Sequence, residues 1–318
     1  MSAAKSFFAV PAVKLFLRAL VTTTILVFIV RSINAQQAWD VMVNARADLL
    51  VAALVMQFAS TAISAYRWQL IMRNLQFGQS FTFYWRSYFK GMFFNQGLPT
   101  SIGGDAIRVL DVAGRGFRKR DALYGVAIDR IAGLGALILL TLVAYVFNRA
   151  LLPLPVYRLM LLITLLSLLG ITSLLVLKRL SWLDRYPQLA YVKAISGRLD
   201  LAFSHNRFML LILSILVPSF AMLGFYATGW ALGLRFDLMT YFAIVPPALV
   251  LTIIPASIAG WGVREGALVG LFSLIGADKT IVLMMSLLYG ITLIIVSIPG
   301  LIVFLQGRQR VQTQRADS

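Results

Sequence analysis

A short motif that ends in an arginine occurs twice in the chain, with an offset of 156 residues and no gap. LPTSIGGDAIR occupies residues 98–108, and IPASIAGWGVR occupies residues 254–264. The identical pairs are Pro99 and Pro255, Ser101 and Ser257, Ile102 and Ile258, Gly104 and Gly260, and Arg108 and Arg264. Self-similarity of this kind predicts an internal repeat.

The residue types of the motif suit the binding of an anion. Proline cannot extend a preceding helix, and Ser101 and Ser257 are good N-caps for a new half-helix. Glycines allow the backbone to approach a ligand closely, and they are Gly103, Gly104 and Gly260. An anion placed there would meet free backbone N–H groups at the positive end of a helix dipole. Arg108 or Arg264, about two turns after the cap, would add a planar fork suited to phosphate.

A second interpretation gives the two arginines structural roles. Arg108 could pair with Asp105, and Arg264 could pair with Glu265, so that the motif only turns a hairpin. Glu265 is the only glutamate in the protein, and it lies beside Arg264. Ionisable groups within a membrane are costly and usually functional, which favours the binding interpretation.

Two further charged residues, Asp129 and Arg130, fall inside an apolar run. Asp129 could be a proton-coupling carboxylate or the counter-ion of a hairpin arginine. The alternative is a structural pair of Asp129 and Arg130 close to the membrane interface.

The elements that carry these residues are predicted to be membrane helices, because 60% of the chain is hydrophobic and only 13% is charged. Six runs are long enough to cross a bilayer as helix, and they cover residues 12–30, 49–66, 122–147, 155–177, 208–232 and 280–305. Two other apolar regions, residues 81–112 and 241–276, are broken by proline and glycine. We expect them to form broken re-entrant hairpins.

The distribution of basic residues orients the chain, since short cytoplasmic loops are rich in Lys and Arg. Most basic residues lie in the segments 1–18, 67–121, 178–207 and 306–318. The opposite segments hold only Arg31, Arg46, Arg149, Arg158, Arg235 and Lys279. Both termini are therefore predicted to be cytoplasmic.

The expected fold is a single all-α transmembrane domain over residues 1–318, with repeat one at 1–150 and repeat two at 151–318. Each repeat has two spans, a broken hairpin and one span, and the second starts on the opposite side of the membrane. Inverted repeats of this type build transporters whose site lies near the midplane, where broken helices meet. Broken backbone at membrane depth must be buried in protein or line a wet cavity.

No catalytic residue, metal or cofactor is predicted. The chain has no cysteine, and its one histidine, His205, lies in a polar stretch where we expect a solvated loop. A GxxxxGK[ST] nucleotide loop is absent from the sequence.

Three segments resemble the flippase-like transmembrane family, also named for the membrane region of lysylphosphatidylglycerol synthase. They are FFNQGLPTSIGGDAIR at 93–108, DRIAGLGAL at 129–137 and PASIAGWGVRE at 255–265. The resemblance implies a role in moving aminoacylated phospholipids or polyprenyl-linked sugars between leaflets. It also implies that the headgroup site is lined by Asn95, Gly103, Gly104, Asp105, Arg108, Arg264 and Glu265.

The expected function is therefore that of a non-enzymatic, flippase-like transporter of anionic phospholipid, such as aminoacyl-phosphatidylglycerol, or of polyprenyl-phosphate-linked saccharide. Arg108 and Arg264 would bind phosphate from opposite sides. Two alternatives are an integral membrane glycosyl or acyl transferase, and a non-catalytic subunit that recruits a lipid-modifying enzyme. The expected partners are the lipid, the membrane and a separate synthase or glycosyltransferase, with no nucleic acid, and the expected location is a bacterial inner membrane.

Overall fold

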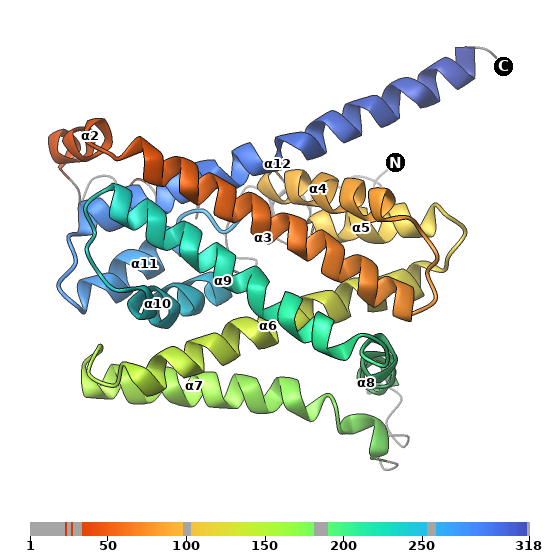
Figure 1. The fold of residues 1–318 in the computed structure, drawn as a ribbon, viewed down its shortest axis with the longest axis horizontal. Coiled ribbons are helices and arrows are strands. Elements are labelled where there is room, and N and C mark those ends of the chain that lie inside the picture. The colour runs from red at the N-terminus through yellow and green to blue at the C-terminus, as the bar shows by residue number, and fades with distance from the viewer. Residues whose placement is uncertain are drawn as a thin grey trace, which may run out of the picture.

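The structure of the protein is a computed structural model that describes residues 34–97, 103–180, 190–252 and 259–316, together with Thr23 and Val27. Over these residues the regular secondary structure is entirely helical (Figure 1). Apart from Thr23 and Val27, the first expected span at 12–30 lies outside the described residues, as do the motif residues Ser101 and Ser257.

Five described helices are long and apolar enough to cross a membrane. They are α3 (Ala47–Asn74), α6 (Lys119–Phe147), α7 (Leu154–Ser173), α9 (Arg207–Ala231) and α12 (Lys279–Ala316). These helices confirm the expectation of an all-α, multi-pass membrane protein and match five of the six expected spans. The count of six stays a prediction.

The two broken apolar regions each fold as a pair of short helices. The first pair is α4 (Phe81–Gly97) and α5 (Gly103–Ala113), and the second is α10 (Leu238–Leu251) and α11 (Val263–Ser273). Three further elements are α2 (Ala35–Val43), the 3-10 helix η1 (Leu177–Arg179) and α8 (Ala190–Ala202).

The two long helices α3 and α9 pack antiparallel along their whole length (Figure 1). Arg46 N donates to the Ala231 carbonyl at 3.0 Å at one end. In the middle, the Ser60 hydroxyl donates to the Val217 carbonyl at 2.9 Å. At the other end, Asn74 Nδ2 donates to the Ala202 carbonyl, which lies just before α9, at 2.6 Å.

This antiparallel pairing is the arrangement that an inverted repeat would have. The 156-residue offset relates Ser60 to position 216, next to its partner Val217. Contacts between the two halves also correspond, because α4 packs on α12 and α10 packs on α6. In the chain, the α4–α5 pair follows the C-terminus of α3. The α10–α11 pair comes between the C-terminus of α9 and the N-terminus of α12. The repeat and its orientation in the membrane stay predictions.

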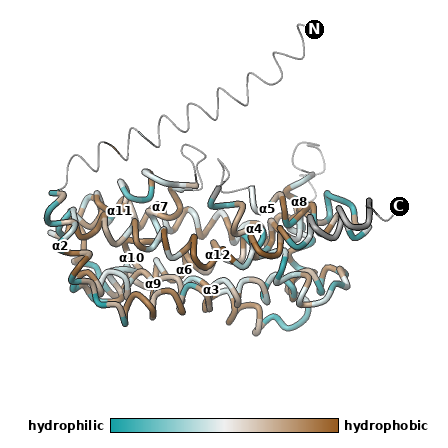
Figure 2. Tube along the Cα trace, turned by 90° about the horizontal axis from the view of Figure 1, so that it is seen from above, coloured by the Kyte–Doolittle hydropathy of each residue, from teal (hydrophilic) through white to brown (hydrophobic). Residues whose placement is uncertain are grey.

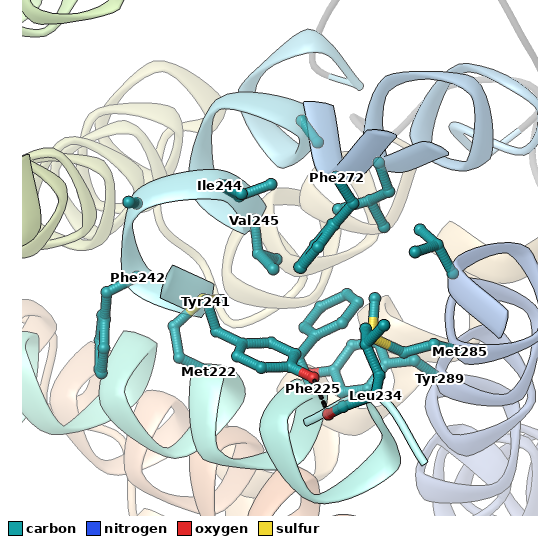
Figure 3. Packing of buried hydrophobic residues seen from close by; sticks show 14 of the residues in the cluster. Met222, Phe225, Leu234, Tyr241, Phe242, Ile244, Val245, Phe272, Met285 and Tyr289 are labelled. Carbon is teal, nitrogen blue, oxygen red and sulfur yellow. Dashed lines mark hydrogen bonds between the residues drawn. The ribbon is translucent and has the colours of Figure 1, made fainter. Parts of the chain in front are cut away.

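A large apolar core joins α9, α10, α11 and α12 (Figure 3). Tyr289 stacks on Phe225 with ring centroids 3.6 Å apart. Tyr241 contacts Phe272 edge to face, and its hydroxyl donates to the Leu234 carbonyl at 3.3 Å. The Tyr289 hydroxyl also donates to the Gln57 side chain on α3, so this core is connected to the first repeat.

The helix α7 presents most of its surface to the outside. Its exposed side chains include Leu159, Leu162, Ile163, Leu165, Leu166 and Leu169. Figure 2 shows that hydrophilic residues gather toward the two ends of the helices, with hydrophobic residues between them. Such a surface is stable in hydrocarbon and would aggregate in water.

Because the natural chain lacks cysteine, the orientation can be tested with single cysteines at the two ends of the bundle. We expect Lys119→Cys to react with an impermeant maleimide only after cells are permeabilised, and Arg149→Cys to react in intact cells. Both native side chains are exposed. The reverse pattern would overturn the orientation inferred from the basic residues.

The contact between α4 and α12 depends on Gly300, because a Cβ there would lie 2.0 Å from the Phe89 carbonyl oxygen. We expect Gly300→Ala to destabilise the protein by about 1–3 kcal/mol, the usual cost of overpacking, and to lower its melting temperature in detergent. The matched control is Gly170→Ala in α7, where a Cβ meets nothing within 4 Å. Equal melting temperatures for the two variants would contradict the close packing.

Candidate functional site

A polar cavity of about 230 Å³ lies between the first-repeat helices α3, α4, α5 and α6, with α12 contributing one residue. Its lining residues are Gln57, Ser60, Thr61, Ser64, Tyr88, Gly91, Met92, Asn95, Gln96, Asp105, Arg108, Arg130 and Leu293. Four residues of the expected site, Asn95, Asp105, Arg108 and Arg130, are therefore brought together.

Five charged side chains form one network at this cavity. Asp129 is 1% exposed and accepts from Arg67 Nε at 3.0 Å and from Arg108 Nη2 at 2.8 Å. Asp105 accepts from Arg108 Nη1 at 3.1 Å and from Arg130 Nε at 2.8 Å. Asp129 is thus the counter-ion of a hairpin arginine and does not pair with its neighbour Arg130.

The network carries an excess of one positive charge, since three arginines face two aspartates. Arginine stays protonated in proteins, so the excess is permanent. Two guanidinium nitrogens within the network, Arg67 Nη1 and Arg108 Nε, are buried without a hydrogen-bond partner among the described residues. Buried polar groups in native proteins nearly always have a partner, so orphaned donors indicate a site for water or an anion.

Aromatic rings hold the Arg108 guanidinium in place. Its Cζ atom lies 4.1 Å from the Trp68 ring centroid and 4.6 Å from that of Tyr88. Cation–π contacts of this length restrict the side chain and leave its edge available for hydrogen bonding. Arg108 is therefore positioned by α3 and α4 as well as by its carboxylate partners.

A stripe of polar side chains on α3 forms one wall of the cavity. Gln57, Ser60, Thr61 and Ser64 share a helix face, because they are spaced three or four residues apart. All four are buried. Ser60, Thr61 and Ser64 donate to backbone carbonyls, so their oxygen atoms can still accept a hydrogen bond. The wall offers neutral hydroxyl and amide groups beside the cationic network.

The equivalent arginine of the second repeat lies in a different environment. Arg264 Nε and Nη2 donate to Glu265 Oε1 at 3.0 and 2.6 Å. The same nitrogens also contact the Ser286 hydroxyl at 3.0 Å and the Ser286 carbonyl at 3.2 Å. Glu265 is fully buried and Arg264 is 6% exposed. This charge is balanced by one carboxylate, as the structural interpretation of the motif predicted.

The helix starts differ from the expected cap geometry in the second repeat. The helix α11 begins at Val263 with Gly262 as its N-cap, so Arg264 lies in its first turn, and Ser257 lies outside the described residues. The reason is backbone conformation, because Ala259, Gly260 and Gly262 all have positive φ and cannot belong to a helix. Gly262 N donates to Glu265 Oε2 at 2.6 Å, so this N–H is not free for an anion.

The glycines of the first hairpin serve helix packing. A Cβ on Gly104 would lie 1.9 Å from the Gly91 carbonyl oxygen, so α4 and α5 touch backbone to backbone. Gly104 N donates to Asn95 Oδ1 at 2.7 Å, which caps the start of α5 with a side chain of α4. Gly103 is the first residue of α5. In the second hairpin, Gly260 lies against Thr252.

Arg67 belongs to the network but was assigned from sequence to a cytoplasmic segment. That assignment was wrong, because the expected span ended at residue 66 whereas α3 continues to Asn74. Arg67 lies inside the helix and is 3% exposed. From sequence alone, a basic residue directly after an apolar run is assigned to a loop, because the acidic residue that pairs with it in the fold is not yet known.

The Asp129 ion pairs should dominate local stability. Asp129→Asn leaves Arg67 and Arg108 without their shared carboxylate, and removing one member of a buried pair costs about 3–5 kcal/mol. We expect a clear loss of melting temperature in detergent. The control is Asp48→Asn, whose partner Arg46 is exposed, and which should leave the melting temperature nearly unchanged. An unchanged melting temperature for Asp129→Asn would contradict a structural role for the network.

Comparison with known proteins gives one family and no curated relative. The family model described as the lysylphosphatidylglycerol synthase TM region matches residues 15–300, which includes both motif copies and all five long helices up to residue 300. A search of curated proteins finds no significant match. The match covers most of the chain and agrees with the resemblance seen in the motifs. The chain therefore belongs to the lysylphosphatidylglycerol synthase transmembrane-region family of membrane proteins.

Proposed function

We propose that the protein is a non-enzymatic lipid transporter that binds the phosphate of an anionic lipid headgroup in the α3–α6 cavity and moves it between leaflets. The observation that carries the proposal is the network around Arg108, which has a surplus positive charge and two unpaired buried donors. A phosphate group in the cavity would supply the missing charge and an acceptor for Arg108, which lines the cavity, whereas Arg67 is not among the lining residues. Its position in a family of lipid-related membrane proteins supports this substrate class.

An apolar cavity next to the polar one supports a lipid over a soluble anion. It has a volume of about 560 Å³ and lies between α6, α7, α8 and α9. Its lining residues on α6 include Ile131, Ala132 and Gly135, which follow Arg130 of the polar cavity directly. The helix α6 therefore presents a cationic group on one side and an acyl-compatible surface on the other. An amphiphile with a phosphate head requires both.

The lining of the polar cavity favours a headgroup rich in hydroxyls. The α3 stripe offers neutral acceptors and an amide, and these suit glycerol or sugar hydroxyls. Asp105 is the only carboxylate in the described lining of this cavity, and Arg108 and Arg130 already engage it. A lysyl ammonium group would find no uncommitted carboxylate in the described lining. Of the two expected substrates, a polyol or saccharide phosphate therefore fits this cavity better than an aminoacylated lipid.

The second repeat is proposed to act as a structural support in this conformation. The charge of Arg264 is balanced by Glu265, and its guanidinium group also contacts Ser286. Arg264 is therefore expected to bind an anion more weakly than Arg108 does. The initial expectation that both arginines bind phosphate from opposite sides is replaced here by a site in the first repeat. The inverted repeat would let the two hairpins exchange environments when the halves rock against each other.

The alternative of a membrane transferase needs a free general base or a positioned metal. Asp105 and Asp129 are each engaged by two arginines, so neither carboxylate is free to act as a general base. The partner-recruiting subunit is the other alternative, and it would tolerate loss of the cavity arginines. We propose a bacterial inner membrane with both termini in the cytoplasm, on the distribution of basic residues.

The test is leaflet exchange of fluorescent phosphatidylglycerol and polyprenyl-phosphate probes in proteoliposomes. The native chain should accelerate exchange, and Arg130→Gln should reduce the rate at least about tenfold, because a charge-assisted hydrogen bond contributes about 1.5–3 kcal/mol. Arg130 is half-exposed and Asp105 keeps Arg108 as a partner in this variant, so folding should be preserved. Arg108→Gln should give the larger loss.

The matched control is Arg149→Gln, which removes one exposed arginine at the far end of α6. Its exchange rate should equal that of the native chain. Folded Arg130→Gln and Arg108→Gln proteins that exchange lipid at the native rate would contradict the proposed site. Absence of exchange for every probe would favour the partner-recruiting subunit.

A further inference from the structure

A second cavity, separate from the proposed transport site, lies between α4, α5 and α12 and has a volume of about 440 Å³. Its lining residues are Ser80, Thr82, Phe83, Arg86, Ser87, Lys90, Leu110, Asp111, Gly114, Arg115, Val303, Gln306 and Gly307. None of them lines the α3–α6 cavity. The function proposed above does not use this space.

The electrostatics of the second cavity are cationic. It contains three basic side chains, Arg86, Lys90 and Arg115, and Asp111 is the only acidic residue in its described lining. Lys90 forms an ion pair with Asp111, which leaves the two arginines as a net positive charge. Arg86 Nη2 donates only a long hydrogen bond of 3.4 Å to Gln306 Oε1, and the Arg115 guanidinium lies 5.2 Å from the Phe83 ring centroid. Neither arginine has an ion pair with another described residue.

A buried hydroxyl group points to an occupant. Ser87 is 2% exposed, lines this cavity, and its hydroxyl has no hydrogen-bond partner among the described residues. The first turn of α4 also faces the space through Thr82 and Phe83, and a helix N-terminus favours negative charge. Guanidinium forks, an orphaned hydroxyl and a helix start are together the donor set that binds phosphate.

The place of the cavity follows from how α4 and α12 cross. The two helices touch backbone to backbone at Phe89 and Gly300. Val303, Gln306 and Gly307 lie one to two turns further along α12, where the helices separate and the cavity opens. One wall belongs to the first repeat and the other wall to the second. An anion bound here would contact both halves at the end of the bundle assigned to the cytoplasm.

We propose that this cavity is a second anion site that binds a phosphate-bearing group between the two halves of the protein. The shared chemistry is a phosphate ester with a small polar substituent, since the space exceeds that needed by one phosphate. The phosphate comes either from an anionic lipid of the cytoplasmic leaflet or from a soluble phosphate ester. The site does not depend on the transport proposal, because it uses different residues.

The experiment places an environment-sensitive dye at the site. Ser80→Cys gives a single cysteine in a chain that has none, at an exposed position on the cavity rim. The labelled protein is reconstituted in nanodiscs of zwitterionic lipid. Glycerol 3-phosphate is titrated in solution in one arm, and phosphatidylglycerol is added to the disc in the other. Saturable dye responses are expected in at least one arm, and the arm identifies the source.

Variants then assign the response to the proposed donors. Arg86→Gln with Arg115→Gln should weaken apparent affinity about tenfold or more, because two charge-assisted contacts are lost. Arg73→Gln with Arg179→Gln removes the same charge from two exposed positions outside the cavity and should leave affinity nearly unchanged.

Two results would overturn the proposal. One is a dye that responds to neither phosphate source in the native background. The other is an equal loss of affinity in the cavity variant and in the Arg73 and Arg179 control, which would assign binding to general surface charge. If the double glutamine variant does not fold, Arg86→Lys with Arg115→Lys keeps the charge but loses the forks. This double lysine variant should bind the phosphate probe more weakly, and native affinity in the lysine variant would also contradict the proposed site.

Discussion

The structure depends most on the neutralisation of one buried carboxylate. Asp129 lies inside the membrane span of α6, where an unpaired charge would be very costly, and Arg67 and Arg108 neutralise it. Arg67 comes from α3 and Arg108 from α5, so one ion cluster fixes three helices against each other. The position of the first hairpin, and with it the polar cavity, follows from this requirement.

The two copies of the motif show how a similar local sequence can lie in different electrostatic environments. With the 156-residue offset, Arg67, Asp129 and Arg130 correspond to Leu223, Met285 and Ser286. The second arginine therefore has no partner equivalent to Asp129, and Glu265 replaces it from the next position in the chain. A repeat that duplicated the whole cluster would bury two excess charges. The surroundings of the repeated arginine therefore differ between the two halves of the chain, with an excess positive charge around Arg108 and a balanced pair at Arg264.

Sequence predicted five long apolar helices and the breaks in two apolar regions better than it predicted the geometry between them. Hydropathy locates α3, α6, α7, α9 and α12 because the period and length of apolar residues are local properties. Arg67 was missed, since its burial depends on Asp129, 62 residues away. The start of α11 was misplaced because its position is set by three residues with positive φ, Ala259, Gly260 and Gly262, which glycine content suggests but does not locate. The substrate class could not be predicted from the sequence, because it depends on which hydrogen-bond donors remain unpaired after the helices have packed.

The helix α4 connects the two cavities physically. Arg86, Ser87 and Lys90 line one of them, whereas Tyr88, Met92 and Asn95 line the other. Gly91 and Gly300 bring the α4 backbone into contact with α5 and α12, so the helix cannot bend locally without separating those surfaces. A tilt of α4 would therefore change the donors of both cavities together. Because α12 belongs to the opposite repeat, any anion that prefers one tilt would bias the relative position of the two halves, and its effect would extend to Arg108 without contact.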